Sequence, residues 1–162
     1  MKKIALIACS KKKLGADCPD RKFKAQDIYT GNSFKKAKAA YKSRFGCEDF
    51  HILSAKYNLL DKDEEIPYYD MYLGHQPSGY RKEWAETVLA KLRRKYDLKD
   101  TVFYIFGGRD YYKDLLPHLN CVVFGYISSG CIDLDSSKEF RNGGKQGEQM
   151  QAQSKKLGSG GK

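Results

Sequence analysis

Residues 3–10 read K-I-A-L-I-A-C-S, and Lys11, Lys12 and Lys13 follow them directly. The apolar run lacks the alternation of a half-exposed strand, which is typical of a strand buried on both faces of a parallel sheet. It stops at a thiol and a hydroxyl, and three positive charges come next. Ligands of open α/β sheets bind beyond the carboxyl ends of the strands. We therefore expect a buried strand whose end contributes to a ligand site.

Strands and helices alternate along the rest of the chain. Further strands are predicted at residues 49–54 (D-F-H-I-L-S), 101–106 (T-V-F-Y-I-F) and 121–126. Helices are predicted over residues 33–45, over residues 78–96 and after Gly107-Gly108, whereas residues 61–77 are predicted to form a long loop. The alternation predicts an α/β fold, a three-layer sandwich with a mainly parallel four- to five-stranded sheet. Residues 1–141 are expected to form a single domain, and residues 142–162, rich in Gly, Gln, Lys and Ser, a flexible tail.

Composition limits the class of protein. The chain has 162 residues, of which 41% are hydrophobic and 31% charged, as in an ordinary globular domain. No apolar run approaches the roughly 20 residues of a membrane span, and the first run is too short for a signal peptide, so a cytoplasmic location is expected. The five cysteines are odd in number and form no C-x-x-C pair, which argues against a disulfide scaffold and a structural zinc site. Neither a metal nor a cofactor is predicted.

Positive charge is concentrated at the start of the chain. The formal net charge is +10, and residues 1–45 hold 13 Lys and Arg against three Asp and Glu. Residues 46–80 hold two against seven. Such a basic region attracts a polyanion, either nucleic acid or a phosphorylated ligand. The alternative interpretation is a solvated lysine-rich surface that keeps the protein in solution.

Three predicted strands end in small or polar residues. The endings are Cys9-Ser10-Lys11, Ser54-Ala55-Lys56-Tyr57 and Gly107-Gly108-Arg109. On one edge of a parallel sheet they supply hydroxyls, ammonium groups and backbone amides, which is the chemistry of a phosphate or base pocket. Ser54 and Lys56 face the same way on an extended chain, and such a pair can activate a hydroxyl. Cys9 is interpreted as a small buried hydrophobe rather than a nucleophile.

The acidic loop contains a second group of candidates. Asp70 lies among Tyr68, Tyr69 and Tyr72 in the segment E-E-I-P-Y-Y-D-M-Y. A carboxylate among aromatic rings can activate water or bind the edge of a base, while the rings stack on that base. The alternative is a tyrosine-rich loop that packs onto the sheet. His75, in the same loop, is a candidate acid or base.

The order of these motifs resembles an uncharacterised family of bacterial and phage proteins. That family has a C-S-K-x-K motif, a Y-x-G-x-x-F motif, an L-S-A-K-Y-G-L-L motif followed by P-Y-D, and a later glycine–tyrosine motif. Here they correspond to C-S-K-K-K, Y-T-G-N-S-F, L-S-A-K-Y-N-L-L, P-Y-Y-D and G-G-R-D-Y-Y, within residues 1–120. Asn58 replaces the usual glycine, and no closing glycine and tryptophan motif follows Tyr126. The motifs are remotely similar to the central domain of archaeosine synthases, which act on a modified base in RNA and have a fold like that of uracil-DNA glycosylases.

The resemblance and the residue pattern together predict the site. We expect Asp70, Ser54 and Lys56 to be catalytic. The predicted ligand-binding residues are Cys9, Ser10, Lys11, Lys13, Tyr29, Gly31, Tyr57, Tyr69, Gly107, Gly108, Arg109 and Tyr112, and the resemblance also marks Phe34. The expected function is an enzyme of the glycosidase or transglycosylase type that acts on a nucleobase or nucleotide, free or within nucleic acid. The alternative is a non-catalytic binder of nucleic acid or of a nucleotide signal, such as a phage counter-defence protein.

Overall fold

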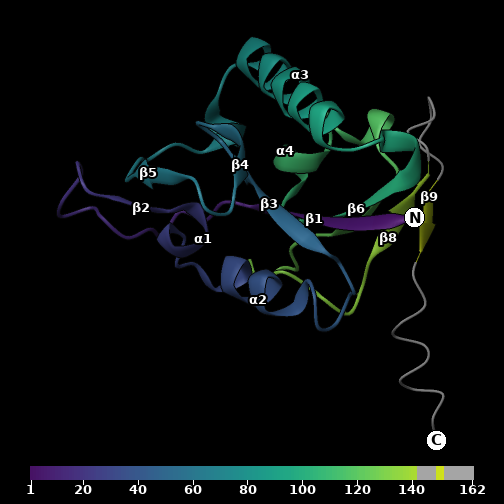
Figure 1. The fold of residues 1–162 in the computed structure, drawn as a ribbon. Coiled ribbons are helices and arrows are strands. Elements are labelled where there is room, and N and C mark those ends of the chain that lie inside the picture. Colours follow the sequence, from purple (N-terminus) through teal and green to yellow (C-terminus); the bar gives the residue numbers. More distant parts are fainter. Residues whose placement is uncertain (142–148, 152–162) are drawn as a thin grey trace, which may run out of the picture.

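A seven-stranded sheet of order β4-β3-β1-β6-β7-β8-β9 forms the centre of the molecule (Figure 1). The computed structural model describes residues 1–141 and 149–151. The strands are β1 (Lys2–Ala8), β3 (Asp49–Ser54), β4 (Asn58–Asp61), β6 (Thr101–Phe106), β7 (Cys121–Phe124), β8 (Lys138–Phe140) and β9 (Gln149–Gln151). The four central strands, β3, β1, β6 and β7, pair in parallel, whereas β4, β8 and β9 are antiparallel to their neighbours.

The predicted apolar strand is the central one. Ile4 to Ala8 of β1 are at most 4% exposed, because strands flank β1 on both sides and other elements cover both faces. In register, Ile7 lies opposite Ile52 of β3 and Phe106 of β6. The carboxyl ends of the three strands therefore meet at one edge. The prediction of a mainly parallel α/β fold is confirmed, but four to five strands is too few, since the short edge strands β4, β8 and β9 carry no long apolar run.

Helices lie on both sides of this sheet. Figure 1 shows α3 (Ser78–Lys95) on one side and α2 (Asn32–Ala40) on the other. Each buries an apolar face: Trp84, Val88 and Leu92 in α3, and Phe34 and Ala37 in α2. Both helices were predicted, although α2 ends five residues before the expected boundary. The finer description as a three-layer sandwich stays a prediction.

The smaller elements depart more from the sequence prediction. The predicted helix after Gly108 is only the short α4 (Arg109–Tyr112), followed by the 3₁₀ turn η3 (Leu116–His118), where Pro117 prevents a regular helix. The predicted loop at 61–77 contains β5 (Glu65–Pro67) and the 3₁₀ turn η1 (Leu73–His75). β5 pairs with β2 (Lys22–Lys24) in a second sheet, next to α1 (Ala25–Ile28). A further 3₁₀ turn, η2 (Leu98–Asp100), precedes β6.

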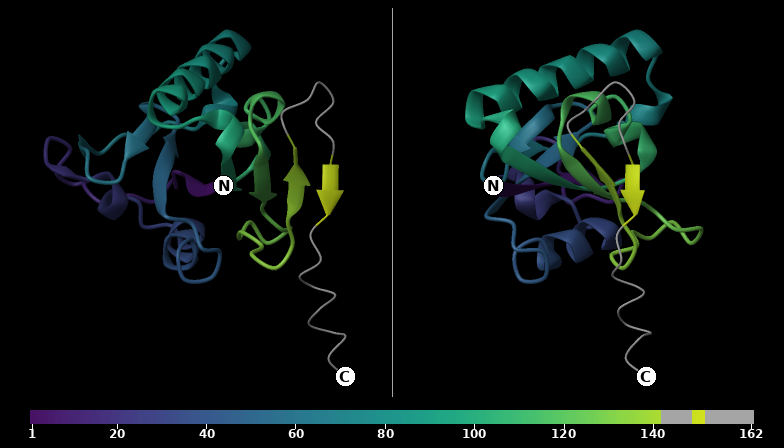
Figure 2. Two further views of the ribbon diagram at one scale, coloured as in Figure 1. Left: turned by 45° about the vertical axis from the view of Figure 1, so that its right-hand side comes forward. Right: turned by 90° about the vertical axis from the view of Figure 1, so that its right-hand side faces the viewer.

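Two other predictions concern the turn at Asn58 and the end of the chain. Asn58 has a φ of 57°, so it adopts the left-handed conformation that asparagine tolerates better than most residues. The predicted tail falls mostly on residues 142–148 and 152–162, which lie outside the described residues. Of the tail, the structure places only β9, beside β8 at the sheet edge (Figure 2). In the described ranges no helix has the length and apolar content that crossing a bilayer demands.

A buried histidine links β3, β4 and the end of α3. His51 is 4% exposed, its Nδ1 lies 2.9 Å from Asp61 Oδ1, and its Nε2 lies 2.6 Å from the Tyr96 hydroxyl. Burial lowers the pKa of His51 below its ordinary value of 6.5, and this effect exceeds the opposing effect of the Asp61 carboxylate. The folded protein therefore binds this proton less readily than the unfolded chain does.

We predict that this histidine makes stability depend on pH. Below about pH 6.5 the unfolded chain takes up the proton first, so the free energy of unfolding should fall as the pH drops. Urea unfolding at pH 8 and pH 5 measures the slope, which His51→Gln should flatten. His118→Gln, at an exposed histidine, is the control. An equal slope in wild type and His51→Gln would contradict the prediction.

Candidate functional site

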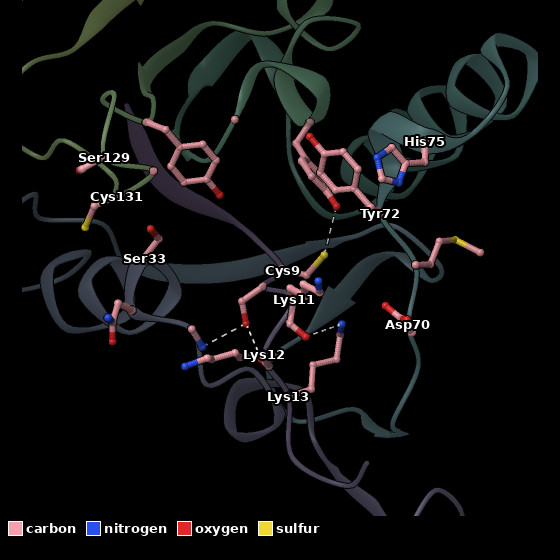
Figure 3. Close-up of a pocket in the computed structure, with 18 of the residues that line it drawn as sticks. Cys9, Lys11, Lys12, Lys13, Ser33, Asp70, Tyr72, His75, Ser129 and Cys131 are labelled. Atoms are coloured by element: carbon pink, nitrogen blue, oxygen red, sulfur yellow. Dashed lines mark hydrogen bonds between the residues drawn. The ribbon is translucent and has the colours of Figure 1, made fainter.

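A cavity of about 940 Å³ lies beyond the carboxyl ends of β1 and β6 (Figure 3). The loop after β1, the start of α2, the segment before α3 and the loop after β7 form its walls. The lining residues are Cys9, Ser10, Lys11, Lys12, Lys13, Gly31, Asn32, Ser33, Asp70, Met71, Tyr72, His75, Gln76, Gly108, Tyr111, Tyr126, Ser129, Gly130 and Cys131. The cavity therefore combines cationic, acidic and aromatic side chains from segments far apart in the sequence.

The end of β1 and the start of α2 are in direct contact. Ser10 Oγ accepts a hydrogen bond from the Gly31 amide at 3.2 Å and donates one to the Lys12 carbonyl at 2.7 Å. A Cβ at residue 31 would lie 2.6 Å from Ser10 Cβ, closer than side-chain carbons approach. Gly31 therefore allows the helix to begin against the strand end, and Ser10 fixes the course of the lysine loop.

This wall of the cavity is strongly positive. α2 carries no acidic residue in its first turn, where carboxylates normally offset the partial positive charge of a helix start. Lys11 and Lys12 are exposed beside it and form no ion pair within the described part of the chain. The electrostatics of this wall therefore favour an anion.

Lys13 lies at the base of this wall among three tyrosines. Its Nζ is 4.5 Å from the ring centroid of Tyr69, 5.9 Å from that of Tyr68 and 6.0 Å from that of Tyr29. It also donates a hydrogen bond to the Lys11 carbonyl at 3.3 Å. Burial lowers the pKa of Lys13, an effect that nearby Cys9 and Asp70 oppose. Lys13 is thus a fixed amine on the cavity wall.

The floor of the cavity holds a thiol with a phenol beside it. Cys9 is 8% exposed, and its Sγ lies 3.4 Å from the Tyr111 hydroxyl. That hydroxyl also accepts a hydrogen bond from the Leu73 amide at 3.5 Å, and either the thiol or the phenol can donate in the contact between them. Burial and the nearby Cys9 raise the pKa of Tyr111, so the phenol stays protonated. Cys9 is therefore both a core residue, as predicted, and part of the cavity surface.

Two exposed tyrosine rings flank the opening. Tyr72 is 47% and Tyr126 46% exposed, whereas Tyr111 is buried. The Tyr72 hydroxyl donates to Asp110 at 2.8 Å, and this bond, together with burial, raises the pKa of Tyr72 to about 12. The Tyr126 ring lies over Gly108, where a Cβ would meet it at 2.8 Å. Rings that are fixed at one side and open at the other provide stacking surfaces.

Asp70 and His75 complete the cavity on the side away from α2. Figure 3 shows Asp70 across the cavity from Ser33, with His75 beside Tyr72. The His75 ring contacts the Tyr72 ring edge to face at 4.7 Å between centroids. Asp70 is exposed and makes no hydrogen bond or ion pair among residues 1–141. A carboxylate and an imidazole are thus available on one side of the cavity.

The structure brings together only part of the predicted site. Seven of the predicted residues line the cavity: Cys9, Ser10, Lys11, Lys13, Gly31, Asp70 and Gly108. Ser54, predicted as catalytic, is fully buried: its Oγ bonds to the Tyr69 hydroxyl at 2.8 Å and accepts from the Tyr57 amide at 3.0 Å. The Tyr69 hydroxyl in turn bonds to that of Tyr29 at 2.7 Å. These groups support the wall from beneath and do not reach the cavity.

The other predicted residues lie outside the cavity for simple geometric reasons. Lys56 is exposed and extends over the Tyr57 ring, because the tight turn into β4 directs it away. Gly107 is buried against Ala8, and Phe34 is a core residue of α2. Arg109 and Tyr112, on the short α4, are likewise not among the lining residues. The pairing of Ser54 with Lys56 as a catalytic unit therefore has no support from the geometry.

Sequence analysis missed part of the aromatic wall. Tyr126 and residues 129–131 line the cavity, since a turn after β7 folds back toward α2. Ser33 Oγ accepts from the Ile132 amide at 3.2 Å, and Lys36 Nζ donates to the Ile132 carbonyl at 3.3 Å. The predicted strand at residues 121–126 included Tyr126, whereas β7 ends at Phe124. Tyr126 was therefore not recognised as a residue beyond the strand end. Within the described ranges no three His, Cys, Asp or Glu side chains gather as a metal site requires.

The chain belongs to a protein family. Residues 4–125 match the family described as a family of unknown function, DUF6884. These residues include the sheet from β1 to β7 and nearly the whole cavity, apart from Tyr126 and the turn that follows it. Neither the curated proteins nor the solved structures gave a match.

The contact between Ser10 and Gly31 gives a test of how the wall is built. We expect Gly31→Ala to lower the free energy of unfolding by about 1–3 kcal/mol, because the new methyl group overlaps Ser10. In the double variant Gly31→Ala/Ser10→Gly the overlap is gone, so the double loss should be smaller than the sum of the single losses. Urea unfolding of the four proteins measures this coupling, and strictly additive losses would contradict the contact.

Proposed function

We propose that the cavity binds a nucleotide unit and that the protein is an enzyme acting on the bond between its base and its sugar. The observation that carries the proposal is the division of one cavity into a cationic wall and an aromatic, acidic side. A nucleotide has the same division, since its phosphate is anionic and its base is flat with a polar edge. The remote resemblance of the motifs to a domain of archaeosine synthases supports the same class of substrate.

The phosphate is assigned to the wall formed by Lys11, Lys12 and the first turn of α2. Ammonium groups and the amides of a helix start both bind phosphate oxygens. No carboxylate in that turn competes for these donors. Lys13 is held lower on the wall by Tyr69 and by the Lys11 carbonyl, so it is placed nearer the sugar than the phosphate.

The base is assigned to the exposed rings of Tyr72 and Tyr126. Stacking on such rings contributes roughly 1–3 kcal/mol per base and tolerates any base. Asp70 and His75 lie on the same side of the cavity and supply an acceptor and a donor. In the proposed hydrolysis Asp70 takes a proton from a water molecule while the oxygen of that water bonds to the sugar carbon C1′. The bond from C1′ to the base breaks, its electron pair leaves with the base, and His75 protonates the base.

Binding is tested with the four 5′-ribonucleoside monophosphates, one at a time, by calorimetry. Tyr126→Ala should weaken the affinity by about 5- to 150-fold, the equivalent of one lost stacking contact. Lys11→Gln should weaken the binding of the monophosphates and leave that of the nucleosides unchanged. Lys56→Gln removes the same charge from a lysine outside the cavity and is the matched control. No binding of any monophosphate to the wild type would overturn the proposal.

Catalysis is tested separately from binding. We expect the wild type to release free base from a bound nucleotide or oligonucleotide, detected by chromatography, and Asp70→Asn to bind as before while base release falls at least 100-fold. Glu86→Gln, at an exposed carboxylate of α3 that does not line the cavity, is the control and should leave base release unchanged. Tight binding with no base release from any tested nucleotide would establish the alternative, a non-catalytic nucleotide binder.

A further inference from the structure

We propose that the substrate is a nucleotide within a single-stranded nucleic acid, and that the outer face of α2 binds the strand next to the cavity. This inference rests on the proposed function and extends it from the bound unit to the whole ligand. The carrying observation is a stripe of exposed residues that begins at the cavity rim and contains cations but no carboxylate.

The stripe follows the helical repeat of α2. Its exposed residues recur every three to four positions, singly or as adjacent pairs, so they lie on one side of the helix and of the turn after it: Asn32, Lys35, Lys36, Ala39, Lys42 and Ser43. Asn32, the first of them, lines the cavity. With a rise of about 1.5 Å per residue, the distance from Asn32 to Lys42 is roughly 15 Å along the axis, enough for several nucleotides beyond the bound one.

The charge of this stripe is not neutralised within the described chain. Residues 28–47 contain five lysines and arginines and no Asp or Glu. Lys35 and Lys42 form no ion pair in residues 1–141. Lys38 and Arg44, which lie off the stripe, are different, because Lys38 Nζ lies 3.6 Å from Asp27 and Arg44 forms an ion pair with Asp135. Lys35 and Lys42 are therefore the two residues whose substitution tests the charge of the stripe most directly.

α3 shows what a merely solvated basic helix looks like in the same molecule. It carries Glu83 and Glu86 among its cations, and its Lys95 lies 3.0 Å from Asp61. Interleaved charges of this kind keep a surface soluble without attracting a polyanion. α2 has no such interleaved carboxylates, and its first residues line the cavity. Its positive charge is therefore placed where it can bind a ligand of the cavity.

A single strand fits better than a duplex. The cavity accepts a base between exposed rings, and a base in a duplex must first be unstacked and flipped out of the helix. A single strand presents that base directly while its phosphates continue along α2. The same lysines serve RNA and DNA, so the experiment includes both.

The experiment compares ligands of one and twelve nucleotides across a salt series. Fluorescence anisotropy reports binding of labelled single-stranded 12-mers of RNA and of DNA, and calorimetry reports binding of the monophosphates. We expect the 12-mers to bind at least tenfold more tightly at 50 mM salt, with an affinity that falls steeply as salt rises. Lys35→Gln/Lys42→Gln should make the slope of log K against log[salt] shallower by about 1.4, since each phosphate contact to a single strand contributes roughly 0.7.

The matched control is Lys82→Gln/Arg94→Gln, which removes two exposed cations from α3 on the other side of the sheet. It should leave the slope within about 0.3 of the wild type, well below one phosphate contact. Equal affinity for 12-mers and monophosphates would overturn the inference and leave the proposed function intact. If both double variants reduce the salt slope equally, the strand is attracted by the general positive charge of the protein, and the inference is overturned. Absence of binding by every ligand would overturn the proposed function and the inference together.

Discussion

The parallel pairing of β1 with β3 and β6 is the constraint on which the site depends. It places the carboxyl ends of three strands at one edge, so that a thiol, a hydroxyl and three ammonium groups leave the sheet beside a helix start. The approach is close: the Cys9 amide donates to the Leu53 carbonyl at 2.9 Å, and a Cβ at residue 107 would lie 2.6 Å from Ala8 Cβ. A register shift of one residue would turn each side chain of the strand to the opposite face of the sheet and separate these groups.

The buried hydroxyls beneath the cavity give Ser54, Tyr69 and Tyr29 a structural role. Ser54 lies at the end of β3, and its hydroxyl joins Tyr69 and Tyr29 in one chain of hydrogen bonds. The Tyr69 ring then contacts the Lys13 ammonium group. These contacts hold together the end of β3, the loop around Tyr69 and the lysine loop. The hydroxyl groups of the network do not line the cavity. These three residues support the cavity wall from beneath and do not themselves line the cavity.

The electrostatic arrangement has a cost that a ligand would offset. Positive side chains around a helix start repel one another and the helix dipole, and folding alone gives no reason to collect them there. Some cations elsewhere in the described chain have carboxylate partners, as Lys62 has with Asp49 and Lys95 with Asp61. Lys11 and Lys12 differ from these lysines, because they have no ion-pair partner in the described chain and they line the cavity.

The sequence alone determined the four central strands, their parallel arrangement, the helices α2 and α3, and the placement of Ser10, Lys11, Lys13 and Asp70 around one cavity. These features come from local signals: unbroken apolar runs, helical spacing and polar residues at strand ends. Only the tertiary structure decided that Ser54 faces the interior while Cys9 reaches the cavity, and that Tyr126 returns over Gly108 as an aromatic wall. The direction of a side chain at a strand end depends on the turn that follows it and on what packs there. Those contacts are made by residues distant in sequence, so no local pattern contains them.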